Sequence, residues 1–116
     1  MITQLLLLIF AHFIGDFIFQ NKEMSLYKNP NNMPVNFAGR TEYFWWIYFS
    51  IAHASMHGLF VALIFNNIYV GILETICHWS IDLGKCNQLY NVHTDFMLHI
   101  MFKLLLIILY GTFICA

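Results

Sequence analysis

The sequence predicts an all-α fold, an integral membrane four-helix bundle made by a single transmembrane domain over residues 1–116. Composition is the first reason: apolar residues make up 60% of the chain and charged residues 9%, whereas soluble domains have about 45–50% and about 25%. The second reason is that four apolar segments approach the roughly 20 residues that a helix needs to cross a bilayer. The length of the chain favours one domain over two.

The four predicted spans cover residues 2–19, 44–65, 68–83 and 96–114. Asn66 and Asn67 are the only break between the second and third spans, which predicts a tight antiparallel hairpin of helices. Residues 21–43 contain both prolines of the chain and many asparagines, residue types that favour turns. We expect this segment to be one long loop.

The loop charges predict how the spans are oriented. Four cationic side chains lie between the spans: Lys22, Lys28, Arg40 and Lys85. The first three belong to the long loop and the fourth follows the third span, while the ends of the chain and the Asn66–Asn67 turn carry none. Because Lys and Arg concentrate in cytoplasmic loops, we expect the loop 21–43 in the cytoplasm and both termini outside it. The expected location is the bacterial inner (plasma) membrane, which the chain crosses several times.

The charge balance bears on the partners of the chain. The formal net charge is −1 and the isoelectric point is about 6.6. No run of Lys and Arg and no zinc-finger spacing is present, so we expect no nucleic-acid partner. The lipid bilayer is the first partner that this composition predicts.

The predicted spans carry ionisable residues that a bilayer rarely accepts, since one such residue at the helix centre costs roughly 2.5–3.5 kcal/mol on insertion scales. Within each span these residues recur every four positions, which places them on one helix face. They are His12 and Asp16 in the first span, His53 and His57 in the second, Glu74, His78 and Asp82 in the third, and Asp95, His99 and Lys103 at the start of the fourth.

The spacing also agrees between spans. One antiparallel alignment of the third and fourth spans pairs Asp82 with Asp95, His78 with His99, and Glu74 with Lys103. The first and second spans, also antiparallel, set Asp16 near His53 and His12 near His57. Polar residues at matching depth on four helices predict one shared interior.

Imidazole and carboxylate groups together are ligands for zinc, iron or manganese, and pairs of them on facing helices build metal sites in bundles. A single histidine in a span is more often a packing residue, but the common spacing over four spans favours a metal or catalytic site. We interpret seven residues as ligands of a divalent metal: His12, Asp16, Glu74, His78, Asp82, Asp95 and His99. These exceed the four ligands of one tetrahedral site, so they suit two metals or one metal with an outer shell.

Three further residues are candidates for catalysis. His53 and His57 are each expected to act as a ligand or as a proton carrier. Lys103 is a cation and would repel a metal, so we assign it either to a charge pair with Glu74 or to holding an anionic substrate.

At these motifs the chain resembles a family of small bacterial and phage membrane proteins known as domain of unknown function 3307. The resemblance rests on the segments 12–20 (HFIGDFIFQ), 53–58, 78–82 (HWSID) with Lys85, and 95–99. In the family, Gln often follows the aspartate of the last motif, where this chain has Phe96. A looser similarity links the chain to predicted membrane-bound metal-dependent hydrolases. These resemblances imply the membrane architecture and the histidine–aspartate site, and leave the reaction open.

Three classes of function fit these observations. The leading hypothesis is a metal-dependent hydrolase at the cytoplasmic leaflet, in which a metal-activated water attacks a lipid ester or phosphoester. The first alternative is a transporter whose buried groups relay protons or a divalent cation. The second is a non-catalytic phage factor that binds a host membrane protein and uses the polar residues to hold its helices together. In each case the site is completed within one chain or across a homo-oligomer.

The predicted orientation can be tested by cysteine labelling of intact cells. In a variant without its native cysteines, Ser25→Cys should stay unlabelled by a membrane-impermeant thiol reagent, because its loop is expected in the cytoplasm. A cysteine added at either end of the chain should be labelled. Labelling at position 25 with none at the ends would overturn this orientation.

Overall fold

The computed structural model describes residues 1–32 and 44–114 of the chain. Every regular element in these residues is helical, which confirms the all-α class. Five are α-helices and two are short π-helical segments. In chain order they are α1 (Ile2–Phe13), η1 (Ile14–Ile18), α2 (Lys22–Tyr27), α3 (Trp45–Phe65), α4 (Ile68–Cys86), α5 (Val92–Leu109) and η2 (Tyr110–Ile114). The part of the expected loop that contains Arg40 lies outside the described residues.

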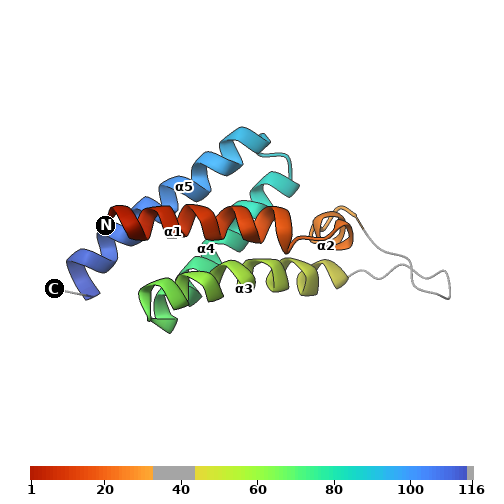
Figure 1. The fold of residues 1–116 in the computed structure, drawn as a ribbon. Helices are drawn as coiled ribbons and strands as arrows, with labels where there is room; N and C mark the ends of the chain where they lie inside the picture. Colours follow the sequence, from red (N-terminus) through yellow and green to blue (C-terminus); the bar gives the residue numbers. More distant parts are fainter. Residues whose placement is uncertain (33–43, 115–116) are drawn as a thin grey trace.

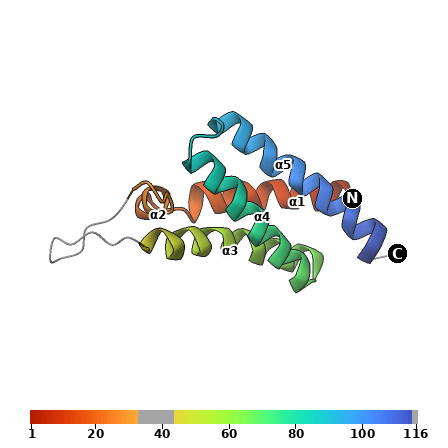
Figure 2. The same cartoon turned by 180° about the vertical axis from the view of Figure 1, so that it is seen from behind.

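The four long helices run up and down beside one another (Figures 1 and 2). Helix α1 packs against α3 and α5, and α4 packs against the same two helices, so that α1 and α4 face each other across the bundle. The start of α1 and the segment η2 lie at one end of the bundle, while α2 and the turn between α4 and α5 lie at the other (Figure 1).

Helices α3 and α4 form the predicted tight hairpin. Asn66 adopts the left-handed conformation with φ 50°, and the side chain of Asn67 caps α4 by accepting hydrogen bonds from the backbone N–H groups of Tyr69 and Val70. The two helices approach closely at Gly58 and Gly71, where a Cβ on either residue would lie 2.6 Å from the carbonyl oxygen of the other. Small residues at this crossing let the backbones touch.

Several helix ends differ from those expected from hydropathy. The expected first span is α-helical only to Phe13 and continues as a π-helix over residues 14–18. The third helix extends to Cys86 and the fourth begins at Val92, because Asn91 caps α5 by accepting from the N–H of Thr94. Capping side chains stabilise helical turns made of polar residues, and a search of the sequence for apolar segments does not detect such turns.

The expected long loop contains a helix, so the prediction of a turn-rich segment was wrong over its first residues. The side chain of Asn21 accepts a hydrogen bond from the N–H of Met24 at 2.7 Å and starts α2, which ends at Tyr27. Lys28 follows α2 directly, and Pro30 comes next but one. The sequence signals for α2 are only a polar N-cap and a short run of residues that tolerate a helix. The prolines further along the segment are stronger signals, and they favour turns.

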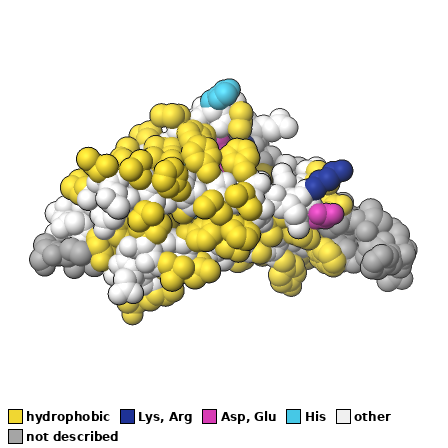
Figure 3. Space-filling view, in the orientation of Figure 1, with side chains coloured by type: hydrophobic (Ala, Val, Ile, Leu, Met, Phe, Trp, Pro, Cys, Tyr) yellow, Lys and Arg dark blue, Asp and Glu magenta, His cyan; other side chains and the backbone are white. Residues whose placement is uncertain are grey.

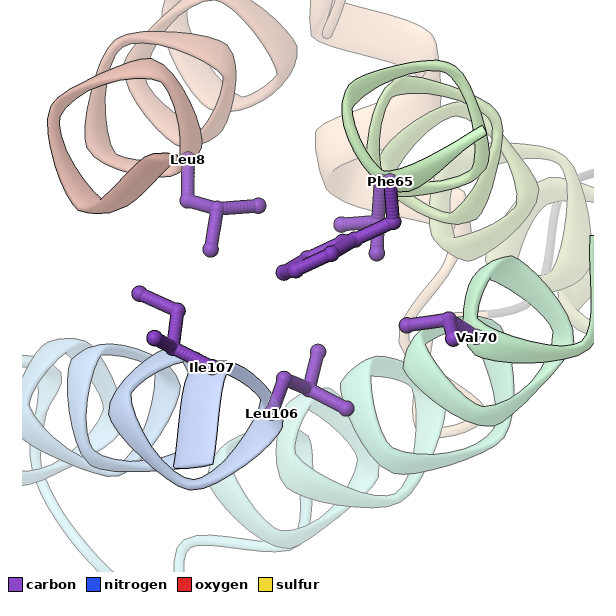
Figure 4. Close-up of a cluster of buried hydrophobic side chains, with 6 residues drawn as sticks. Leu8, Phe65, Val70, Leu106 and Ile107 are labelled. Carbon is purple, nitrogen blue, oxygen red and sulfur yellow. The ribbon is translucent and has the colours of Figure 1, made fainter. Parts of the chain in front are cut away.

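The interior of the bundle has an apolar half and a polar half. The apolar half lies toward the chain ends and consists of Leu8, Val61, Phe65, Val70, Leu106 and Ile107, most of which Figure 4 shows pointing toward one another from α1, α3, α4 and α5. The polar half contains the histidines and carboxylates. Among the described residues, 11 buried side chains are polar or charged and seven are apolar, the reverse of a soluble core.

The exterior of the bundle is largely apolar, as Figure 3 shows for one face. Phe10, Leu59, Ile76 and Ile108 on the four long helices each expose more than half of their surface. By length and composition, two helical stretches suit a membrane span: residues 45–65, with a mean hydropathy of 1.6, and residues 92–113, with 2.0. A shorter apolar helix runs from Ile2 to Ile18.

The close crossing of α3 and α4 predicts that even one methyl group is too large at Gly58. Gly58→Ala would place Cβ against the Thr75 hydroxyl and the Gly71 carbonyl, and overpacking of this kind costs about 1–3 kcal/mol. We expect a lower thermal unfolding midpoint in detergent. Gly111→Ala is the matched control, because its Cβ meets nothing within 4 Å. Equal midpoints for the two variants would contradict this account of the crossing.

Candidate metal centre

Five histidines from four helices face one another in the polar half of the bundle. They are His12 of α1, His53 and His57 of α3, His78 of α4, and His99 of α5. Each is at most 2% exposed. The Nε2 atom of each ring also lies within 3.7 Å of a carboxylate oxygen of Asp16 or Asp82. The same ring nitrogen of all five side chains therefore points into one volume.

Asp16 is the first carboxylate at the centre of this cluster. Its Oδ1 atom lies 3.0 Å from His57 Nε2 and 3.3 Å from His53 Nε2, and its Oδ2 atom lies 3.3 Å from His12 Nε2. Asp16 sits in the π-helical segment η1, a type of helix irregularity that is frequent at functional sites. The neighbouring Gly15 is needed because a Cβ there would lie 2.6 Å from His57 Nε2.

Asp82 of α4 is the second central carboxylate. Its Oδ1 atom lies 3.2 Å from His99 Nε2. Its Oδ2 atom lies 3.4 Å from His53 Nε2 and accepts a hydrogen bond from Lys28 Nζ at 2.9 Å. The two oxygens of Asp82 thus face two different histidines on two different helices.

The imidazole rings also contact one another directly. His57 and His78 stack with their centroids 3.8 Å apart, and the rings of His78 and His99 are 4.2 Å apart. The Nε2 atoms of His53 and His78 lie only 3.3 Å apart. At that distance either one nitrogen donates a proton to the other, or both lone pairs face a shared cation.

Three lysines neutralise three of the four carboxylates in the bundle interior. The pairs are Glu74 with Lys103 at 2.7 Å, Asp82 with Lys28 at 2.9 Å, and Asp95 with Lys85 at 3.2 Å. Asp16 has histidines as its only ion-pair partners among the described residues. Among the described residues, Asp16 is therefore the interior carboxylate without a lysine partner, and its charge is left for another cation, such as a metal ion.

The charge of Lys85 is secured by its surroundings at the end of α4. Burial of its side chain works against the charged form, but the neighbouring Asp95 carboxylate outweighs this effect and raises the pKa of Lys85 above its usual value. The ammonium group therefore remains protonated and holds Asp95 Oδ2.

The donor atoms form three sets in which all atoms lie within 4.8 Å of one another. The sets are Asp16, His53, His57 and His78; His12, His78 and His99; and Asp82, Asp95 and His99. Zinc–ligand bonds of 2.0–2.2 Å in a tetrahedral site imply ligand atoms about 3.3–3.6 Å apart. Three separations within the first set, 3.0–3.3 Å, are at or slightly below this range, so these donor atoms are close enough to share one divalent metal.

Two of the close contacts lack hydrogen-bond geometry. Nε2 of His57 and Nε2 of His12 are buried and make no hydrogen bond, although each lies within 3.3 Å of an oxygen of Asp16. Short distance without alignment is the arrangement of two ligands that both point at a third atom. For His57, which shares a donor set with Asp16, this arrangement suits two ligands of one metal. His12 shares no donor set with Asp16.

The structure reproduces the registers expected from the sequence. His78 lies against His99, Glu74 pairs with Lys103, and Asp16 contacts His53. Asp82 and Asp95 fall in one donor set, and the rings of His12 and His57 are 5.2 Å apart.

Two of the candidate residues lie apart from the donor sets. Glu74 belongs to none of them, because its Oε1 atom accepts a hydrogen bond from Lys103 and lies 3.6 Å from His78 Nδ1. Lys103 is 1% exposed and its ammonium contacts the Glu74 carboxylate. Of the two roles expected for Lys103, this geometry favours the charge pair.

Lys28 is the residue that sequence reasoning missed. It comes from the segment after α2, is 5% exposed, and reaches across to Asp82. The adjoining Asn31 anchors this segment by donating to the Cys86 carbonyl at 3.1 Å. The only signal in the sequence was the charge count, since the four carboxylates of the predicted interior were matched there by one lysine.

The fold and the site together define an all-helical bundle with a buried histidine–carboxylate centre. The chain belongs to the family described as Protein of unknown function (DUF3307), which it matches over residues 4–115. This match confirms the resemblance seen in the sequence motifs. No curated protein and no solved structure matches the chain.

The buried Glu74–Lys103 pair predicts a double-mutant result. Lys103→Met should destabilise the fold by roughly 3–5 kcal/mol because it leaves the Glu74 carboxylate buried without its cation. Adding Glu74→Gln should recover much of the loss. Thermal unfolding in detergent measures both variants, and a single variant as stable as the wild type would rule out the pairing role.

Proposed function

We propose that this chain is a multi-pass membrane protein that binds a divalent metal within its helix bundle. The observation that carries the proposal is the first donor set, in which one donor atom from each of Asp16, His53, His57 and His78 lies within 4.8 Å of the other three. Three imidazoles and one carboxylate suit zinc, iron or manganese. In this reading His53 and His57 are ligands, and Asp16 supplies the charge that no described lysine neutralises.

The distribution of side chains supports the membrane part of the proposal. Apolar residues cover the outside of the long helices, and ionisable residues fill one half of the inside. Helix α3 has 21 residues, which at 1.5 Å per residue spans about 31 Å, close to the hydrocarbon thickness of a bilayer. The cations of the loop and of the α4–α5 end favour a cytoplasmic position for that end, with both termini on the other side.

We propose hydrolysis of an ester or phosphoester at the cytoplasmic leaflet as the activity. A bound divalent metal supplies Lewis acidity, lowering the pKa of a bound water and polarising the scissile group. The remaining tasks fall to the protein. Lys28 and Lys85 pair with Asp82 and Asp95 and so offset carboxylate charge that would repel an anionic substrate group. His12, with Nε2 at 3.3 Å from Asp16 Oδ2, is placed to accept a proton.

The overall reaction needs only water as a co-reactant. One oxygen–hydrogen bond of water and the ester bond to the leaving alcohol break. A new bond forms between the water oxygen and the acyl carbon or phosphorus, and the proton passes to the alcohol. No oxidant or reductant is required.

The two halves of the interior favour hydrolysis over transport. Asp16 and Lys85 are partly exposed at their side chains, at 25% and 32%, toward the end that carries α2. The other half is closed by the cluster that includes Leu8, Phe65 and Leu106. Partial exposure of the polar half at that end suits a substrate that enters and leaves on the same side.

Metal analysis and hydrolysis assays of the purified protein in detergent test this proposal. We expect stoichiometric divalent metal in the wild type, and chelator-sensitive release of product from a panel of phospholipids and chromogenic esters. His57→Asn should lower metal affinity and activity by about 100-fold or more, because loss of even an outer partner costs about 10–100-fold. His93→Asn is the matched control, since His93 is an exposed histidine outside every donor set.

Each result of this experiment decides between classes of function. Wild-type protein that binds zinc, iron or manganese no more tightly than His57→Asn would contradict the metal site. Binding to a host membrane protein would then be the better-supported function. Tight metal binding without hydrolysis of any substrate class would favour cation transport, which vesicle uptake of the bound metal would then measure.

A further inference from the structure

The proposed metal at Asp16 leaves a second donor set in the bundle unused. Asp82 of α4 with Asp95 and His99 of α5 form this set, and the three donor atoms lie within 4.8 Å of one another. All three residues are at most 5% exposed. His99 Nε2 lies 3.2 Å from Asp82 Oδ1 and 3.6 Å from Asp95 Oδ1. These two separations are close to the about 3.3–3.6 Å expected between ligands of one metal.

One atom of this set has no other role in the structure. Asp95 Oδ1 is buried and makes no hydrogen bond, and a buried acceptor without a partner costs free energy unless something binds there. The other oxygen of Asp95 is held by Lys85, and Asp82 Oδ2 is held by Lys28. Each lysine contacts the Oδ2 atom of its carboxylate, and the Oδ1 atoms of both carboxylates face His99 Nε2.

Asp82 connects this set to the first one. While its Oδ1 faces His99, its Oδ2 lies 3.4 Å from His53 Nε2, which belongs to the first donor set. Asp82 is not a member of the first set, but its two oxygens face a ligand of each set, which places it between the two sets. A carboxylate in such a position can bind one metal with each oxygen, and in two-metal sites the metals lie about 3.5–4 Å apart.

We propose that Asp82, Asp95 and His99 bind a second divalent metal, so that the bundle holds a two-metal centre joined by Asp82. This inference rests on the proposed function, because the first metal is the one proposed at Asp16. Three protein ligands leave a position open for water or substrate. Two metals clamp the attacking and leaving oxygens of a phosphoester. Lys28 and Lys85, by pairing with Asp82 and Asp95, offset carboxylate charge that would repel the same anion. The substrate class is therefore a phosphoester.

The number of metal ions per chain tests the inference. Protein reconstituted separately with Zn²⁺, Mn²⁺ and Fe²⁺, and freed of excess metal, should retain two ions per chain with the metal it prefers. Asp95→Asn and His99→Asn should each retain one ion, since both leave the Asp16 set intact. His93→Asn should retain two. His93 lies two residues before Asp95 on the same helix, yet is exposed.

The Mn²⁺-loaded protein gives a second measurement that is independent of stoichiometry. Two bridged Mn²⁺ ions should show an exchange-coupled electron paramagnetic resonance spectrum, and Asp95→Asn should convert it to the spectrum of an isolated ion. Thermal unfolding measurements confirm that each variant is folded. If Asp95→Asn does not fold, His99→Asn is measured in its place.

The outcomes separate this inference from the proposed function. One ion per chain in the wild type, retained in Asp95→Asn and His99→Asn, would overturn the two-metal centre and leave the single-metal site standing. Absence of retained metal in the wild type would overturn both. Two ions with hydrolysis of carboxyl esters but not of phosphoesters would overturn the substrate class.

Discussion

The contacts between two carboxylates, Asp16 and Asp82, and the surrounding imidazoles are the constraint on which the rest of the structure depends. Each carboxylate reaches histidines from more than one helix: Asp16 contacts α1 and α3, and Asp82 contacts α3, α4 and α5. A register shift of one residue in any of these helices would turn its polar side chains away from the cluster. The cluster therefore fixes the depth at which the four long helices meet.

This arrangement reverses the usual basis of a helix bundle. The apolar cluster around Leu8, Phe65 and Leu106 fills only the half of the interior near the chain ends. In the other half, polar contacts hold the helices together, and the exterior is apolar. Inside the proposed bilayer such contacts have no water to compete with, so an unpaired group is costly and a satisfied one gives specificity. Buried polar groups then define a single packing, which apolar contacts between lipid-exposed helices do not.

The three buried or partly buried lysines hold the carboxylates of the bundle interior in place through ion pairs. Each binds one oxygen of a carboxylate and leaves the other oxygen free or directed toward a histidine, as Lys85 does with Asp95 and Lys28 with Asp82. Outer partners of this kind orient ligands and set their charge. Lys28 also links the α2 segment to the bundle interior. Its contact with Asp82 is the only connection between the loop and the site among the described residues.

The sequence by itself determined the class of fold, the positions of the long helices and most of the cluster. Period and composition are local properties, so the four-residue spacing from Glu74 to Asp82 identified a polar face without any tertiary information. The antiparallel registers followed as well, because short turns such as Asn66–Asn67 leave neighbouring helices little freedom. The tertiary structure alone decided the rest. It placed Lys28 on Asp82, separated Glu74 from the donor sets, and introduced the π-helical turn that carries Asp16. These features depend on how a loop and four helices pack in three dimensions, and no local pattern in the sequence records that packing.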